Sequence, residues 1–309
     1  MIIAVALILT SIVAGFSVAI LISAPRYNGP VSDHFDGKKF FNPGNGKPQG
    51  LTAVLKWLIT RKPGAWAESK TNDFGKRPLA HEKETVRVTF VNHSTFLIQV
   101  DGINILTDPV WSLRVSPFTW AGPKRMRLPG IRFEDLPRID VVLISHNHYD
   151  HLDLPTMRTL FGAHHPTIIT PLGVKAFLDQ QMISGSVDMD WWEEQGLKNS
   201  VIVQSVPAQH FSGRGALDRD ATLWCGYVLK TSKGNIYFAG DTGYNNATFK
   251  EIGERFGKMH ISLLPIGAYK PSWFMSPVHT SPEEAVKIHL EVKSEKSIGT
   301  HFGTFPLAD

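Results

Sequence analysis

One stretch of the sequence decides the fold: Ser145-His146-Asn147-His148-Tyr149-Asp150-His151-Leu152-Asp153. Three histidines and a carboxylate fall within six residues, directly after the apolar run of residues 140–145, which predicts a buried strand. Neutral imidazole with carboxylate support is the ligand set that zinc and other borderline divalent metals favour. A tight loop at the end of a strand can turn such side chains toward one point. The stretch therefore predicts a metal site at the end of this strand.

The pattern His-x-His-x-Asp-His resembles the hallmark of the metallo-β-lactamase superfamily. The resemblance implies that His146 and His148 belong to one metal ion. The pair Asp150 and His151 would then belong to a second ion. It also implies three further ligands, each placed after a predicted strand: His210 completing the first site, Asp241 bridging both metals, and His301 completing the second site.

An earlier aspartate, Asp108 in Thr107-Asp108-Pro109, resembles the superfamily residue that hydrogen-bonds the metal loop and steadies it. A plain turn residue is the alternative interpretation of this position.

The remaining composition favours hydrolysis by metal-activated water. Cys225 is the one cysteine, which excludes a zinc site built from several thiolates and an internal disulfide framework. The sequence contains neither a Gly-x-Ser-x-Gly elbow nor a phosphate-binding Gly-x-x-x-x-Gly-Lys loop. Two divalent ions about 3.5 to 4 Å apart lower the pKa of a water molecule and stabilise developing negative charge. Phosphodiesters, activated esters and lactones suit such a site.

Strand and helix signals place the hydrolase domain at residues 84–309. Alternating apolar residues predict a β-meander, and the chain then changes to mixed α/β: strands at 86–91, 96–100, 103–107 and 167–170, helices at 154–161 and 171–180. A second series follows: strands near 201–206, 223–230, 235–240 and 261–265, helices at 247–256 and 282–291. Ser281 can cap the last helix, with Pro282 at its first position. Two β-rich halves with outer helices predict an αββα four-layer sandwich.

The N-terminus predicts attachment to a membrane. Residues 2–24 form an uncharged, almost wholly apolar run, long enough as a helix to cross a bilayer core of roughly 30 Å. We interpret residues 1–24 as a transmembrane anchor, with a cleaved signal peptide as the alternative. Basic residues follow the run and none precedes it, so the positive-inside rule predicts a single-pass membrane protein with its catalytic domain in the cytoplasm. Residues 25–83 are interpreted as a linker and N-terminal extension.

Longer strings resemble a narrower family: Gly122-Pro123-Lys124-Arg125, residues 143–153, Pro207-Ala208-Gln209-His210, and residues 238–244, 268–275, 282–286 and 301–305. From about residue 60 onward, they resemble the N-acylphosphatidylethanolamine-hydrolysing phospholipase D family. The resemblance implies that zinc-activated water cleaves a lipid phosphodiester, releasing phosphatidic acid and an N-acylethanolamine. The implied cofactors are two Zn²⁺ ions, although histidine and carboxylate ligands also accept iron or manganese.

The predicted catalytic residues are Asp150, Asp241 and His279. His279 matches a family position associated with the active site, where it would hold a phosphate oxygen or assist the leaving alcohol. A residue at the entry to the final helix is the alternative. The chain departs from the family at Val278, where the family enzyme carries glutamine. It also ends at Asp309, earlier than family members generally do, which predicts a shortened variant or a truncated chain.

Two segments are candidates for contact with lipid. Residues 111–133 mix aromatic and cationic side chains, which suit a membrane interface; a loop folded over the sandwich is the alternative. Residues 51–58 carry leucines at helical spacing and predict a helix packed on the domain, with an interfacial helix as the alternative. The net charge of +4 selects no partner. Because no nucleic-acid module is recognisable, we expect a phospholipid membrane and a lipid phosphodiester as partners, and no nucleic acid. The oligomeric state is not predicted.

The sequence therefore predicts a membrane-attached binuclear zinc hydrolase of phospholipase D type. Two alternatives stay open. One is a hydrolase of the same fold that acts on a lactone, a cyclic nucleotide or RNA. The other is a non-catalytic protein in which metal stabilises a membrane-bound binding domain.

Overall fold

The alternating runs of the predicted meander form three antiparallel strands at one side of the first sheet. A computed structural model describes residues 17–44, 49–69 and 74–309. Within this part of the chain, the first sheet has the order β1-β2-β3-β4-β5-β6 and is antiparallel from β1 to β3 and parallel from β3 to β6. Its strands are β1 (Arg87–Asn92), β2 (Thr95–Val100), β3 (Ile103–Thr107), β4 (Val141–Leu143), β5 (Thr167–Pro171) and β6 (Ser186–Met189).

The second sheet has the order β12-β11-β10-β9-β8-β7 and is also mixed. Its strands are β7 (Glu194–Gly196), β8 (Ile202–Val206), β9 (Gly226–Thr231), β10 (Gly234–Phe238), β11 (Met259–Pro265) and β12 (Ser297–Thr300). Strands β10, β11 and β12 are parallel, and β7 to β10 are antiparallel.

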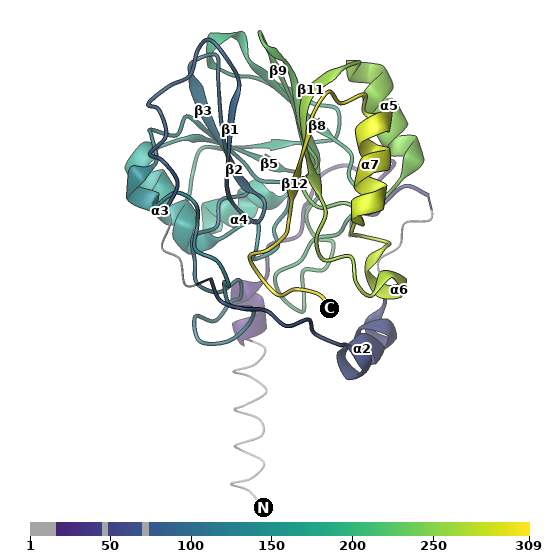
Figure 1. The fold of residues 1–309 in the computed structure, drawn as a ribbon. Coiled ribbons are helices and arrows are strands. Elements are labelled where there is room, and N and C mark those ends of the chain that lie inside the picture. Colours follow the sequence, from purple (N-terminus) through teal and green to yellow (C-terminus); the bar gives the residue numbers. More distant parts are fainter. Residues whose placement is uncertain (1–16, 45–48, 70–73) are drawn as a thin grey trace, which may run out of the picture.

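Helices cover the outer faces of the two sheets, as Figure 1 shows. The first sheet carries α3 (Leu154–His164) and α4 (Val174–Gln180), and the second carries α5 (Asn246–Phe256) and α7 (Pro282–Glu291). Ser281 caps α7 as predicted: its Oγ accepts from the Glu284 backbone N–H, and the Glu284 carboxylate accepts from the Ser281 N–H. This arrangement confirms the predicted α/β sandwich with two mixed sheets.

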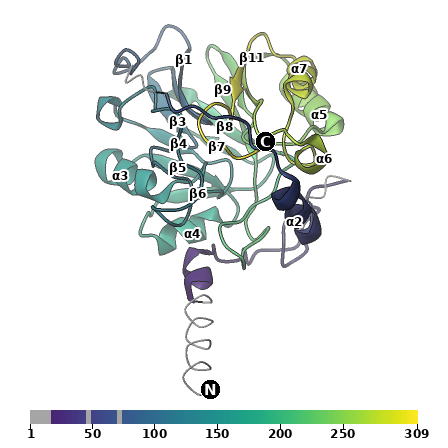
Figure 2. The ribbon, with the colours of Figure 1, turned by 60° about the horizontal axis from the view of Figure 1, so that its bottom comes forward.

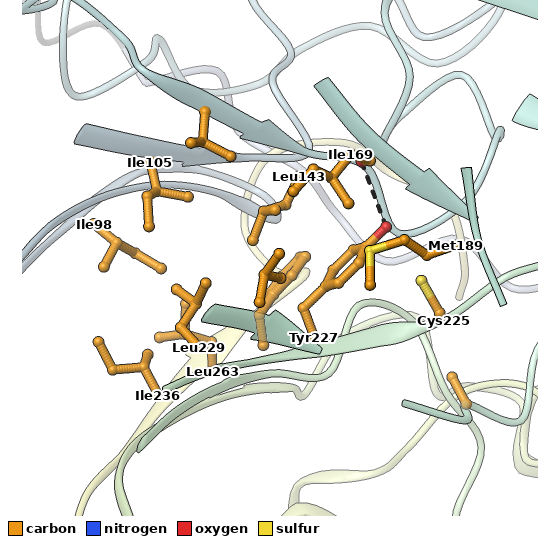
Figure 3. Close-up of a cluster of buried hydrophobic side chains, with 14 of the residues drawn as sticks. Ile98, Ile105, Leu143, Ile169, Met189, Cys225, Tyr227, Leu229, Ile236 and Leu263 are labelled. Carbon is orange, nitrogen blue, oxygen red and sulfur yellow. Dashed lines mark hydrogen bonds between the residues drawn. The ribbon is translucent and has the colours of Figure 1, made fainter. Parts of the chain in front are cut away.

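The main hydrophobic core lies between the sheets. Side chains from both inner faces interdigitate there, including those labelled in Figure 3. Tyr227 of β9 is fully buried, and its hydroxyl donates to the carbonyl of Ile144 at 2.8 Å, across the space between the sheets. Figure 3 shows its longer contact, of 3.4 Å, with the carbonyl of Ile169. Separate apolar clusters fill the outer layers beneath the helices. Strand β4 leads into the histidine loop and β12 leads into His301, and residues far apart in sequence meet where these strands end.

The segment before the first strand contributes to this core. Phe35 and Phe40 are almost fully buried and pack with residues of both sheets. The backbone N–H of Ala24 donates to the carboxylate of Asp218 at 2.8 Å. Farther along, α2 (Leu51–Thr60) lies against the short helix α6 (Ser272–Met275), at the end of the molecule where the chain terminates (Figure 2).

The prediction of a single-pass membrane protein needs correction. Most of the predicted anchor, residues 1–16, lies outside the described residues. Across residues 17–44, 49–69 and 74–309, no helix combines the length and the apolar character that a membrane span requires. The cytoplasmic orientation depended on that span and is withdrawn with it.

Candidate metal centre

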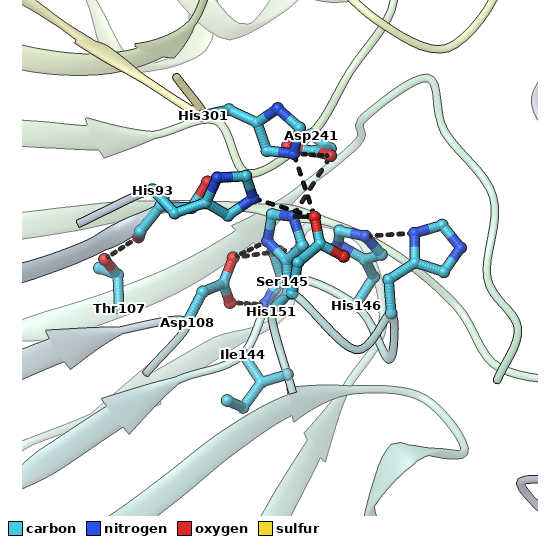
Figure 4. Close-up of polar contacts among 12 residues, drawn as sticks. His93, Thr107, Asp108, Ile144, Ser145, His146, His151, Asp241 and His301 are labelled. Carbon is cyan, nitrogen blue, oxygen red and sulfur yellow. Dashed lines mark hydrogen bonds and ion pairs between the residues drawn. The ribbon is translucent and has the colours of Figure 1, made fainter. Parts of the chain in front are cut away.

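The histidine loop leaves β4 and is held at its start by neighbouring strands. The N–H of Ile144 donates to Ile169 at 2.9 Å, and the carbonyl of Ser145 accepts from Cys225 of the second half at 2.9 Å. The loop then turns sharply, because the N–H of Leu152 donates back to the carbonyl of His148 at 2.8 Å. This turn directs imidazole and carboxylate groups toward one region, as Figure 4 shows.

The first cluster joins the two leading histidines of the loop to His210, which follows β8. His148 Nδ1 lies 2.8 Å from His146 Nε2 and 3.4 Å from His210 Nε2. His210 donates its Nδ1–H to the carbonyl of Val278 at 2.8 Å, which leaves the Nε2 lone pair free to face the other histidines. Because Val278 contributes its backbone to this contact, its departure from the family's glutamine does not alter it.

The second cluster joins Asp150 and His151 to His301 and Asp241. Asp150 Oδ2 lies 3.4 Å from His151 Nε2 and 3.3 Å from His301 Nε2. Asp241 Oδ2 lies 3.3 Å and 3.0 Å from the same two nitrogens. Four ligands placed tetrahedrally at zinc's usual bond lengths would stand about 3.3 to 3.6 Å apart. The side chains are therefore spaced as a metal of this size requires.

Asp241 lies between the two clusters. Its Oδ2 is also 3.9 Å from His210 Nε2 of the first cluster. Its other oxygen, Oδ1, is buried without a hydrogen-bond partner in the part of the chain that the structure describes, as is His151 Nε2. Buried polar atoms of this kind are costly unless a ligand satisfies them. The unpartnered atoms and the spacing of the side chains fit a pair of divalent cations that share Asp241.

Asp108 contacts the metal loop directly. Its Oδ1 accepts from the Ser145 N–H at 2.7 Å, and its Oδ2 accepts from the Ser145 hydroxyl and from His151 Nδ1–H, each at 2.6 Å. The last contact fixes the imidazole tautomer so that Nε2 faces the second cluster. The position is thus more than a turn residue in this structure.

The charge balance of the centre favours cations. Buried carboxylates meet here, and all their ion pairs among the described residues are with histidines: Asp108, Asp150 and Asp241. Burial lowers the pKa of His148 and of His210 to about 3, so both imidazoles remain neutral and keep a lone pair for a ligand bond. This electrostatic setting suits divalent metal ions.

His279 lies beside this centre, as predicted from the sequence. It follows α6, with its N–H donating to the Met275 carbonyl at 2.9 Å. Its Nδ1 is 3.8 Å from Asp241 Oδ2 and has no hydrogen-bond partner within residues 17–44, 49–69 and 74–309. The ring therefore reaches the centre, and its role there stays a prediction.

Sequence reasoning missed one residue of the centre, His93, which lies between β1 and β2 and is labelled in Figure 4. Its Nε2–H donates to Asp150 Oδ2 at 2.9 Å. A signal was available, because Asn92-His93-Ser94 forms the turn of a predicted hairpin, where glycine, asparagine or aspartate is usual. A histidine at that position, with φ of +48°, needs a reason.

Comparison with known proteins agrees with this geometry. Residues 103–302, more than half of the chain, match the Beta-lactamase superfamily domain. The chain belongs to the metallo-β-lactamase superfamily. Igni18, a metallo hydrolase from Ignicoccus hospitalis, superposes with a TM-score of 0.57 at 23% identity, over 72% of this chain and 86% of that chain. That likeness shows the fold alone.

Two relatives confirm the narrower resemblance. The N-acyl-phosphatidylethanolamine-hydrolyzing phospholipase D 1 of Caenorhabditis elegans is 35% identical over 302 residues, covering 92% of this chain and 83% of that protein. The mitochondrial enzyme of the same name from Saccharomyces cerevisiae is 38% identical over 71% of this chain, which spans about half of the yeast protein (48%). This metallo-β-lactamase superfamily member is thus a metal-dependent hydrolase that resembles N-acylphosphatidylethanolamine-hydrolysing phospholipase D.

Proposed function

We propose that this chain is a binuclear hydrolase, with zinc as the expected metal, that cleaves a lipid phosphodiester as a phospholipase D does. Its products would be phosphatidic acid and an N-acylethanolamine. The observation that carries the proposal is that two clusters of histidine and aspartate side chains share Asp241. The chain is also similar, over 92% of its length, to a protein named as an N-acyl-phosphatidylethanolamine-hydrolyzing phospholipase D.

The proposed ligands are His146, His148 and His210 for one ion, and Asp150, His151 and His301 for the other, with Asp241 between them. Two divalent ions held there would activate a water molecule and stabilise the negative charge that develops on the phosphate. The protein's own part is to fix the ligands: Asp108 orients His151, and the Val278 carbonyl orients His210.

In this proposal, His279 completes the catalytic set with Asp150 and Asp241. Its ring is mostly buried, with 13% of the side chain exposed, and lies 5.2 Å from the His210 ring and 5.4 Å from the His301 ring, centroid to centroid. Burial lowers its pKa to about 3, so the imidazole is neutral at physiological pH. A neutral ring can donate its N–H to a phosphate oxygen or to the departing alcohol oxygen. We therefore assign His279 to substrate positioning.

The outer face of α2 supports approach to a bilayer surface. No residue of this helix is buried, and Leu51, Leu55, Leu58 and Ile59 are each at least half exposed. The opposite side packs on α6, where Trp57 stacks on Phe274 with ring centroids 5.0 Å apart. The packed face fits the first interpretation of this helix, and the exposed face supports the interfacial one. Helix α2 thus lies beside the segment that leads into His279.

The loop of residues 111–133 is divided between the same two roles. Trp111 and Arg125 fold inward: the Trp111 indole donates to Ile131, and the buried Arg125 guanidinium donates to Val110 and Ser112. Trp120 is 77% exposed and Leu113 is 56% exposed. Within this proposal the exposed part contacts lipid, and residues 25–83 form an extension of a hydrolase domain at residues 84–309.

A comparison of substrates tests the proposal. We would incubate the zinc-reconstituted protein with vesicles of N-acylphosphatidylethanolamine or phosphatidylcholine, and separately with an acyl lactone and a short RNA, following products by mass spectrometry beside His148→Ala. Phosphatidic acid with N-acylethanolamine, absent for the variant, is expected. Turnover of the lactone or RNA alone would keep the hydrolase and overturn the lipid substrate.

Substitution Asp241→Asn separates a catalytic from a purely structural metal centre. We expect a loss of activity of about 100-fold or more, because the shared ligand loses its charge, with a much smaller change in the unfolding midpoint. A variant that loses stability and activity in the same proportion would favour the metal-stabilised binding protein.

A further inference from the structure

The backbone of His93 has a left-handed conformation, which residues other than glycine adopt uncommonly. It lies in the two-residue turn between β1 and β2, with φ of +48° and only 1% of its surface exposed. A left-handed backbone costs free energy for any residue with a side chain other than glycine, and asparagine tolerates it better than histidine does. A hairpin turn alone would therefore not require this side chain.

The segment that follows β12 fixes His93 on both sides. The backbone N–H of His93 donates to Thr304 Oγ1 at 2.9 Å, and the backbone carbonyl of His93 accepts from the His301 N–H at 2.9 Å. Its ring packs against the His301 ring, with centroids 4.1 Å apart, and against the edge of Phe305. The imidazole thus has little freedom to rotate, and its position is tied to that of His301.

Among the described residues, Asp150 is the one hydrogen-bond partner of the ring. Nε2–H donates to Oδ2 at 2.9 Å, whereas Nδ1 is buried without a partner. The same oxygen stands 3.3 to 3.4 Å from the nitrogens of His151 and His301. A donor on this oxygen stops the carboxylate from turning about its own bond and keeps it directed at the second cluster.

We propose that His93 is a positioning residue for the second metal, holding the Asp150 carboxylate in place for binding through its Nε2–H. The inference rests on the metal centre of the proposed function, and not on the identity of the substrate. In this proposal His93 does not bind the metal itself. It acts through Asp150 and His301.

Two substitutions of similar length isolate the hydrogen bond. His93→Gln brings an amide N–H close to the place of Nε2, whereas His93→Met fills similar space without a donor, and both carry the same backbone penalty. We would measure zinc affinity by chelator competition, metal content by mass spectrometry, and thermal unfolding in excess chelator. We expect His93→Met to bind the second ion ~10- to 100-fold less tightly. His93→Gln should recover most of that loss, while both variants unfold at similar temperatures in chelator.

Each result decides between readings. Unchanged affinity in His93→Met would overturn the inference, and so would equal weakening in both variants accompanied by equal loss of stability in chelator. The visible spectrum of the cobalt-substituted protein adds a further check, since a change of its ligand-field bands in His93→Gln would make His93 a ligand. If the unaltered protein binds no divalent metal, the proposed function itself fails, whatever the variants do.

Discussion

Protonation of two histidines at the metal centre, His301 and His151, makes metal binding depend on pH. Burial alone would lower the pKa of His301, but the carboxylates of Asp241 and Asp150 raise it to about 9. The pKa of His151 is likewise raised well above its ordinary value, because the same carboxylates and Asp108 outweigh the effect of burial. Near neutral pH both rings therefore hold protons that a metal ion must displace.

We accordingly expect zinc affinity to rise with pH up to about 9, with protons released on binding. Titration calorimetry of the chelated protein, in two buffers that differ in ionisation enthalpy, would count those protons. The Asp108→Asn variant provides the control, because Asp108 raises the pKa of His151 without being a proposed metal ligand, so its replacement should reduce the proton release. An affinity that does not change between about pH 6 and about pH 9 would contradict this prediction.

At this scale, the sequence predicted the residues that are close together in the chain. The six-residue histidine loop predicts metal binding, and the family resemblance adds His210, Asp241 and His301. The structure brings all of these side chains together. Their role as ligands stays a prediction. His93 was missed because its contact with Asp150 joins residues 57 positions apart, and neither hydrophobic periodicity nor a local motif encodes such a pair.

Among the elements, α2 offers a test of the approach to lipid. Replacing Leu55 and Ile59 by glutamate should reduce binding to anionic vesicles and the rate on vesicle substrate by about 10-fold or more, because two apolar side chains are lost and charge is placed at the surface. Hydrolysis of a short-chain, water-soluble phosphodiester should stay unchanged. Flotation with vesicles and both rate assays would measure this.

A matched control is the double variant Thr60→Glu and Lys62→Gln, which lowers the net charge by the same two units at exposed positions away from the apolar row of α2. It should bind vesicles nearly as the unaltered protein does. If this control lost binding to the same extent as the variant of Leu55 and Ile59, net charge and not the apolar face would govern the contact.

Element boundaries show where local sequence signals stop being sufficient. The strand predicted at residues 140–145 is narrower, Val141–Leu143, because Ser145 turns away to meet Asp108. The helix predicted from residue 171 begins at Val174, since Pro171 still belongs to β5 and Gly173 has φ of +86°. The short strands β6 and β7 were not predicted, because their residues alternate weakly and depend on neighbours across the sheet.

Across the whole molecule, His34 connects the N-terminal segment to the sandwich. Its Nδ1 lies 2.6 Å from Asp33 and its Nε2 lies 2.7 Å from Asp190, and its ring stacks on Trp191. Burial lowers its pKa, but the hydrogen bonds to Asp190 and Asp33 outweigh burial, so the folded-state pKa is raised above 6.5. The protonated ring can donate to both carboxylates at once.

The raised pKa of His34 makes the stability of the protein depend on pH. Because the folded pKa exceeds the unfolded one, this contribution to stability is complete below about pH 6.5 and is lost as pH rises through the folded pKa. Urea unfolding across this range should show His34→Gln losing that dependence, whereas His81→Gln, at an exposed position, should retain it. Parallel pH profiles for the His34 variant and the unaltered protein would refute the assignment.

Sequence patterns predicted the overall arrangement of the chain only in part. Two β-rich halves indicated the sandwich, yet the first apolar run led to a membrane-spanning interpretation that the described helices do not support. Length and hydropathy describe what a segment could do in a bilayer. The buried Ala24, by contrast, donates its N–H to Asp218, which lies 194 residues away in the sequence.

The division of the proposed ligands between the two halves has a consequence for fragments of the chain. His146, His148, Asp150 and His151 precede the connection between β6 and β7, and His210, Asp241 and His301 follow it. If the gene were cut at that connection, neither product would hold a complete site. Reassembly of the two fragments should then depend on the supply of zinc. Light scattering of the mixed fragments, with and without chelator, would show whether the metal ion holds them together.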